Sequence, residues 1–140
     1  MRPVYHILAS ASVAAVVYRL SGSVVASGAS LATGVLIDLD HLVDYFKARG
    51  PQFDWQYFMG GEYFSDNGQI IVPMHSIELL LVLAALTPLL GQVTTLGMAV
   101  SFCLHLLMDL WVYPLHPLTY SFIFRWLNRF DLTVLVLEER

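Results

Sequence analysis

The sequence predicts an all-α integral membrane protein that forms a single embedded helical domain over residues 1–140. Hydrophobic residues make up 57% of the chain and charged residues 13%, whereas soluble domains are typically about 45–50% apolar and about 25% charged. Four apolar stretches approach or reach the roughly 17–25 residues that a helix needs to cross a bilayer. The net charge is -4 without any basic run, so the composition does not indicate nucleic-acid binding.

The first two predicted spans cover residues 4–20 and 22–37. The start resembles a signal peptide, but its small-x-small site at Ser10–Ser12 lies inside the apolar run, so we predict a retained span. The second stretch is rich in glycine, alanine and serine. Small residues allow membrane helices to approach closely, so we expect this helix to be central in the bundle.

The third and fourth predicted spans cover residues 70–90 and 93–113. Residues 42–69 differ from them, because they hold eight aromatic residues and several turn signals. Aromatic rings prefer the membrane interface, so this segment is expected to be an interfacial loop or a re-entrant segment. Residues 118–137 are expected to form a C-terminal interfacial helix, with a short fifth span as the alternative.

The Lys and Arg residues predict the orientation of these spans. With four spans, one side of the membrane holds Arg19 alone, and the other side holds Arg2, Lys47, Arg49, Arg125, Arg129 and Arg140. The positive-inside rule then places both termini and the aromatic segment in the cytoplasm. The expected location is therefore the inner membrane, with several passes through it.

Histidines and acids lie at the cytoplasmic ends of all four predicted spans. An ionisable side chain near hydrocarbon costs at least about 2.5–3.5 kcal/mol, so such residues need a compensating cation, partner charge or water-filled cavity. We interpret them as one metal site at the cytoplasmic interface. The predicted ligands are His6, Asp38, Asp40, His41, His75, His105 and Asp109.

Spacing supports this interpretation. Three His–carboxylate pairs have the spacing of neighbours on a helix face, namely Asp38 with His41, His75 with Glu78, and His105 with Asp109. Zinc binds imidazole nitrogen and carboxylate oxygen, and these donors exceed one tetrahedral site. We therefore expect one to three divalent ions, with zinc as the metal. Asp44 and Glu78 are the candidate general bases.

Other interpretations of these residues stay open. Asp44 could be a solvated loop acid, and Glu78 could orient His75 instead of acting as a base. His116, between two prolines, has weaker support as a ligand. The whole cluster could instead be a buried salt-bridge network. The chain has only seven Lys and Arg residues, and none lies inside the spans near these acids, which argues against that network.

The motifs occur in the order His6, Asp38-Leu39-Asp40-His41, Met74-His75-Ser76, and His105 through Asp109 with Pro114 beyond. In this order they resemble, over roughly residues 5–117, a bacterial and archaeal family of membrane-bound metal-dependent hydrolases. That family includes the LexA-regulated inner-membrane protein. A more remote similarity extends to the zinc-dependent phospholipase C and P1 nuclease group. This resemblance implies a helical zinc site and phosphodiester hydrolysis.

The resemblance implies a hydrolase that cleaves a phosphoester, such as a lipid headgroup, with a metal-bound hydroxide as the nucleophile. Its partners would be membrane lipid and a phospholipid-like substrate. The alternative is a non-catalytic structural or assembly subunit with a structural metal. Ile70, where the family has the first histidine of a His-Arg-Gly motif, favours that alternative. Transport would need polar residues in the other leaflet, where the spans offer little beyond Ser and Thr.

Overall fold

The computed structural model describes residues 3–137, and this part of the chain is all-helical, as predicted. Within it there is no strand, and only two isolated β-bridges occur, Gln69 with Asp131 and Leu115 with Val136. The chain divides into two compact units. Unit 1 comprises Met1–Ile37 and Glu78–Tyr113, and unit 2 comprises Asp38–Ile77 and Pro114–Arg140.

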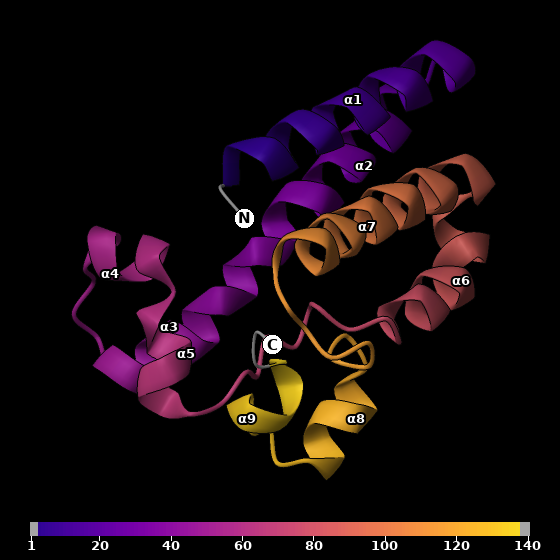
Figure 1. Cartoon of the computed structure of the whole chain (residues 1–140). Coiled ribbons are helices and arrows are strands. Elements are labelled where there is room, and N and C mark those ends of the chain that lie inside the picture. The colour runs from indigo at the N-terminus through magenta and orange to yellow at the C-terminus, as the bar shows by residue number, and fades with distance from the viewer. Residues whose placement is uncertain (1–2, 138–140) are drawn as a thin grey trace. The chain divides into compact units, whose positions relative to one another are not determined.

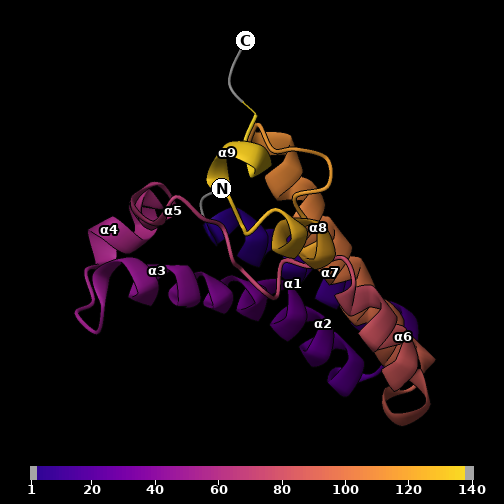
Figure 2. The same cartoon turned by 90° about the horizontal axis from the view of Figure 1, so that it is seen from below.

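Unit 1 is a bundle of four helices: α1 (Pro3–Ser21), α2 (Val24–Leu36), α6 (Leu79–Leu90) and α7 (Gln92–Val112). α2 packs against both α1 and α7, and α6 packs against α7 (Figures 1 and 2). The side chain of Ser23 caps α2 by accepting a hydrogen bond from the amide of Ala26. α7 packs against all three of the other helices and is the central one, whereas α2, for which we predicted that position, packs against α1 and α7.

Small residues and hydroxyl groups fill the contacts between α1, α2 and α7. A Cβ atom built on Gly34 would lie 2.9 Å from Ser10 Cβ, so the backbone of α2 approaches α1 too closely for any larger residue. Ser30 Oγ lies 2.8 Å from Ser101 Oγ and donates to the carbonyl of Gly97 at 3.0 Å. These buried hydroxyls are satisfied inside the bundle.

Only α1 and α7 are both long enough and apolar enough to cross a membrane within the described residues. α2 has 13 residues and α6 has 12. Twelve residues span about 18 Å, less than the hydrocarbon thickness of about 30 Å. The predicted helical span over residues 70–90 is wrong in its first part. Its helix begins only at Leu79. Pro73 lacks an amide hydrogen, and the amides on either side of it donate to the carboxylates of Asp44 and Asp40 instead of to helix carbonyls.

Unit 2 consists of short helices: α3 (His41–Arg49), α4 (Trp55–Gly60), α5 (Glu62–Asn67), α8 (Phe122–Leu127) and α9 (Leu132–Leu135). A 3₁₀ turn, η1 (Ile37–Asp40), leads from α2 into α3. The interfacial loop predicted for residues 42–69 is therefore three helices instead. Asp54 caps α4, and Gly61, with φ of 73°, allows the chain to reverse into α5.

The aromatic residues of α3, α4 and α5 pack around Tyr45, which is fully buried. Its ring centroid lies 5.1 Å from that of Phe53, 5.5 Å from Phe58 and 6.0 Å from Tyr63. The Tyr45 hydroxyl donates to the carbonyl of Gln52 and accepts from the amide of Asp54, the residue that caps α4. The aromatic composition of this segment thus builds a small core of its own.

The single interfacial helix expected over residues 118–137 is also wrong. Arg129 and Phe130 have positive φ values of 56° and 60°, which ends α8 and turns the chain into α9. Leu135 of α9 is fully buried and forms a core with Ile70 and Val72. This tertiary contact favours two short helices over one continuous amphipathic helix.

Candidate metal centres

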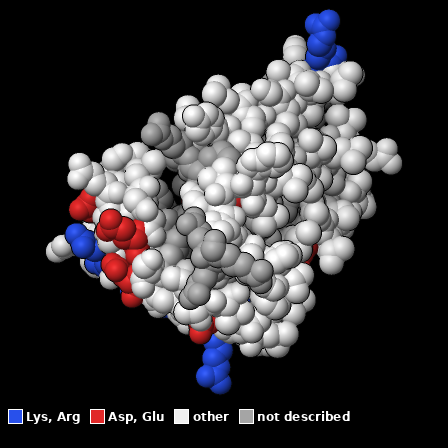
Figure 3. Space-filling view, in the orientation of Figure 1, with Lys and Arg blue, Asp and Glu red and all other residues white. Residues whose placement is uncertain are grey.

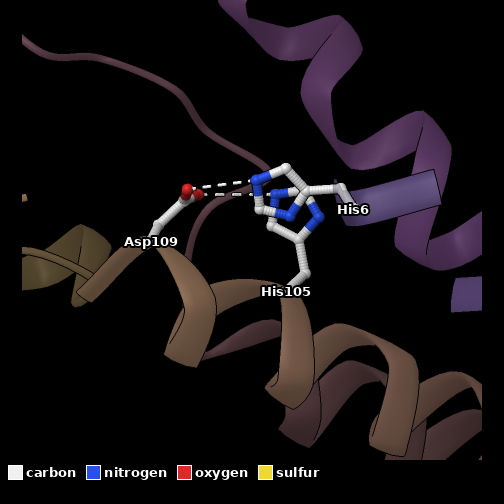
Figure 4. Close-up of side chains that lie close together, drawn as sticks. All are labelled: His6, His105 and Asp109. Atoms are coloured by element: carbon white, nitrogen blue, oxygen red, sulfur yellow. Dashed lines mark ion pairs between the residues drawn. The ribbon is translucent and has the colours of Figure 1, made fainter. Parts of the chain in front are cut away.

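Six of the seven predicted ligands fall into two groups, one inside each unit. We call His6, His105 and Asp109 the His6 group; all three are buried in unit 1. His6 comes from α1, and the other two lie one turn apart on α7. Figure 4 shows both imidazole rings turned toward the Asp109 carboxylate. His6 Nε2 lies 3.2 Å from Asp109 Oδ1, and His105 Nε2 lies 3.5 Å from Asp109 Oδ2.

The backbone of α2 fixes the orientation of His105. Its Nδ1 lies 2.9 Å from the carbonyl oxygen of Gly34, and a carbonyl can only accept, so Nδ1 carries the hydrogen. In the neutral ring, Nε2 then turns a lone pair toward the carboxylate of Asp109. A lone pair facing an anion in a buried site is unfavourable unless a proton or a metal cation lies between them.

His6 contributes the second imidazole of this group and faces Asp109 through Nε2. Its ring stacks on that of His105 with centroids 3.9 Å apart, so two imidazolium charges would repel at this distance. Its Nδ1 is buried and has no hydrogen-bond partner among the residues that the structure describes. A buried polar atom without a partner costs about 1–3 kcal/mol, and such atoms mark places where an ion or water is needed.

The second group, which we call the His75 group, consists of Asp38, His41 and His75 in unit 2. Both imidazole Nε2 atoms face the same carboxylate oxygen, Asp38 Oδ1, at 3.8 Å from His41 and 3.6 Å from His75. The two rings are nearly perpendicular, with centroids 5.0 Å apart. The predicted pair of Asp38 and His41 is confirmed as neighbouring side chains, because η1 and the start of α3 keep a helical course.

Asp40, predicted as a ligand, lies behind His75 instead of beside its Nε2. Its Oδ1 lies 3.0 Å from His75 Nδ1, and its Oδ2 accepts from the amides of Met74 and His75. Burial opposes the charged imidazolium, but the hydrogen bonds to Asp38 and Asp40 outweigh it and raise the pKa of His75 to about 9. Asp40 therefore has the position of a carboxylate that orients a metal-binding histidine.

Tyr63 supports His41 in a similar way. The Tyr63 hydroxyl lies 2.8 Å from His41 Nδ1, which leaves Nε2 facing Asp38. Tyr63 and Gly34 were not predictable as supports, because both contacts join segments that are distant in sequence. No local spacing signal could have identified them.

Asp44 and Glu78, the candidate bases, have different surroundings. Both carboxylate oxygens of Asp44 accept backbone hydrogen bonds at 2.9 Å, from Ile71 and from Val72. Burial raises the pKa of Asp44, although these two amides act in the opposite direction. Glu78 is half-buried at the start of α6. It does not share a helix face with His75 as predicted, because the chain from 70 to 78 is not helical.

His116 belongs to neither group. Its Nδ1 accepts from the amide of Leu118 at 3.1 Å, and its ring stacks on Phe124 with centroids 4.9 Å apart. These contacts give it a structural position in unit 2.

We expect Asp44→Asn to lower the free energy of unfolding by about 1–3 kcal/mol, because one of two buried amides would face an NH2 group instead of an oxygen. Thermal unfolding in detergent measures the loss. Asp66→Asn is the matched control, since Asp66 is exposed, and we expect a change within about 0.5 kcal/mol. Equal stability of the two variants would contradict the structural position of Asp44.

Comparisons with protein-family models, with curated proteins and with solved structures found no match to this chain. The functional assignment therefore depends on the geometry of its own residues.

Proposed function

We propose that this protein is a membrane-bound, metal-dependent hydrolase of phosphoesters, in which the His6 group and the His75 group each bind a divalent ion, with zinc as the expected metal. The observation that carries the proposal is the shared orientation of His41, His75 and His105. Each has Nδ1 held by a protein oxygen and Nε2 turned toward a carboxylate. Metal-binding histidines almost always have their other ring nitrogen held in this way by a protein oxygen or water.

The donor set of each group fits such an ion. Two imidazoles and one carboxylate are three ligands, and catalytic zinc sites keep a fourth position for water or substrate. A divalent metal held there would activate water and polarise a phosphoryl oxygen. The chain's own residues would hold the ion and fix the rings, through Gly34 in the His6 group and through Asp40 and Tyr63 in the His75 group. The motif resemblance supports a phosphoester as substrate, with a lipid headgroup as the expected form.

The distribution of polarity in unit 1 supports a membrane location. Its buried positions include several hydroxyl residues, whereas Leu20, Leu81, Leu89 and Trp111 are 74–90% exposed. This is the reverse of a soluble core. Only 17% of the α1 span and 44% of the α7 span are buried, unlike the core helices of a soluble protein. On the face in Figure 3, unit 1 is almost entirely white apart from the end of α1, where Arg19 lies.

Within this proposal, all four helices of unit 1 cross the inner membrane, with α2 and α6 as short spans. A short apolar helix is accommodated by local thinning of the bilayer, or by non-helical segments that are covered by protein. α1 is proposed as a retained span, because it supplies His6 and the buried Ser10 to the bundle. The termini and the metal groups would then lie on the cytoplasmic side.

The topology is tested with single cysteines in a Cys103→Ser background. We expect a membrane-impermeant maleimide to label Ser21→Cys in intact cells, and Gln52→Cys only after permeabilisation. Both positions are exposed, which makes them a matched pair. The reason is the six-to-one division of Lys and Arg between the two sides. The opposite labelling pattern would overturn the orientation. Equal labelling of both positions in intact cells would show that residues 21 and 52 lie on the same side, and would overturn the single membrane crossing proposed between them.

One observation favours a second function, that of a structural subunit whose metals only stabilise the fold. Asp44, a candidate base, has both oxygens committed to backbone amides. A hydrolase would need another group, or the metal alone, to generate the nucleophile.

The deciding experiment measures metal content and hydrolysis together. Protein purified in detergent is analysed for zinc, then assayed with bis(p-nitrophenyl) phosphate and with phosphatidylcholine in mixed micelles, before and after chelation and zinc restoration. We expect stoichiometric metal and activity that disappears with chelation and returns with zinc. Stoichiometric metal without hydrolysis would support the structural subunit. Absence of bound metal after zinc loading would overturn both functions.

A further inference from the structure

The segment that carries His75, residues 71–76, depends on charged side chains for its backbone hydrogen bonds. Asp44 accepts from the amides of residues 71 and 72, and Asp40 accepts from those of residues 74 and 75. Residue 73 is a proline and has no amide hydrogen. Two carboxylates therefore accept from four amides of a segment that forms neither helix nor sheet, and the amide of His75 also donates to the carbonyl of Val72.

Arg125 of α8 satisfies the acceptors of the same segment. Its Nη1 donates to the carbonyl of His75 at 2.8 Å and to that of Thr119 at 2.7 Å. Its Nη2 donates to the carbonyl of Val72 at 3.0 Å and to Ser76 Oγ at 2.7 Å. Arg125 is fully buried, and it is the one buried Lys or Arg between residues 4 and 137. A buried charge is retained only where its hydrogen bonds compensate the loss of water.

We propose that Arg125 is a positioning residue for the His75 group. Its guanidinium holds the backbone at Val72 and at His75 itself, while Asp40 holds the imidazole of His75. Together these contacts fix both the backbone and the ring, so that Nε2 faces Asp38. The metal-binding consequence rests on the function proposed above, whereas the immobilisation of residues 71–76 does not.

The geometry of the contacts requires arginine. Its planar fork presents several donors in fixed directions, and two of its nitrogens here reach four acceptors on two different stretches of chain. A lysine ammonium has three donors on one nitrogen, so it cannot reproduce this spread. Arg125→Lys therefore keeps the charge and removes the fork. Arg125→Met keeps a long aliphatic side chain and removes every donor.

The test uses Arg125→Lys and Arg125→Met, with Arg129→Lys as the matched control. Arg129 is exposed and lies in the turn after α8. Hydrogen exchange is measured on metal-free protein for the peptide covering residues 71–77, with an α7 peptide as internal reference. Cobalt(II) titrations are recorded in a His105→Ala background, which isolates the His75 group, and in a His75→Ala background, which isolates the His6 group.

We expect Arg125→Lys to accelerate exchange of residues 71–77 by about tenfold or more, with α7 unchanged. Cobalt affinity at the His75 group should fall by about 10–100-fold with altered d–d absorption bands, as expected when the support of a ligand is lost. The His6 group should keep its affinity for cobalt. Arg125→Met should accelerate the exchange of residues 71–77 and weaken cobalt binding at the His75 group more than Arg125→Lys does. Arg129→Lys should match the parent protein.

Wild-type exchange and cobalt binding in Arg125→Lys would overturn the proposal. Equal acceleration in α7, or equal weakening of both metal groups, would also overturn it, because Arg125 would then only support the fold as a whole. If the wild-type chain binds no cobalt, the proposed function fails. The exchange of residues 71–77 then decides the positioning role by itself.

Discussion

His105→Ala should remove one of two bound zinc equivalents, and His75→Ala should remove the other. The reason is that the two histidines belong to different groups, each complete within its own unit. Zinc content after gel filtration gives the stoichiometry, and competition with a chromophoric chelator gives the affinities. The double variant should retain no tightly bound zinc.

The loss of metal should be accompanied by a loss of stability. In His105→Ala, Asp109 stays buried while one of its two imidazole neighbours is gone. Removing one partner from a buried charged pair costs about 3–5 kcal/mol. We therefore expect a clearly lower melting temperature for this variant, and chelation of the wild-type protein should lower the melting temperature in the same direction.

His116→Ala is the control, because it removes an imidazole that belongs to neither group. It should keep both zinc equivalents, whatever it does to the local packing on Phe124. Loss of both ions from either single ligand variant would contradict independent binding by the two groups. Full stoichiometry and wild-type melting in His105→Ala would remove the metal interpretation, and the His6 group would then be a hydrated polar cluster.

Part of the candidate site was predictable because two of its pairs lie in continuous helical turns. Asp38 with His41, and His105 with Asp109, have spacings that place side chains on one helix face, and both pairs are in contact. All-helical structure was also predictable, because the predicted membrane location would require backbone groups to be satisfied within helices or closed barrels. These predictions needed only local periodicity.

The predictions that failed concern segments whose structure is decided by distant residues. The apolar pattern of residues 70–78 suits a helix, but its backbone amides donate hydrogen bonds to the carboxylates of Asp40 and Asp44 instead. The C-terminal pattern suits one interfacial helix, but burial of Leu135 against Ile70 favours two. In both places a tertiary contact overrides the local preference.

The role of each acid was not predictable from residue type. Asp38 and Asp40 are two positions apart, yet one faces two Nε2 atoms and the other holds an Nδ1 atom and two amides. Arg125 gave no signal in the sequence, because its acceptors on residues 72–76 lie about fifty positions earlier in the chain. Such assignments require the fold.

Gly34→Ala should destabilise the protein by about 1–3 kcal/mol, even though alanine is the better helix former. In an open helix position this change stabilises by up to about 1 kcal/mol. At Gly34, however, the new Cβ would lie 2.1 Å from Ser10 Oγ, 2.9 Å from Ser10 Cβ and 3.3 Å from Ser101 Cβ. The hydroxyl can rotate away, but Ser10 Cβ cannot, so α1 and α2 must separate.

The same displacement should reach the His6 group, because the carbonyl of Gly34 holds His105 Nδ1. We therefore expect weaker zinc binding at the His6 group and wild-type affinity at the His75 group, measured by chelator competition alongside thermal unfolding. Gly28→Ala is the matched control on the same helix, since a Cβ there meets nothing within 4 Å. It should be neutral or stabilising. The double variant Ser10→Gly with Gly34→Ala removes the clashing atoms, so it should be more stable than the sum of the single changes predicts. Equal stability of Gly34→Ala and Gly28→Ala would contradict the close packing of α1 on α2 at the His6 group.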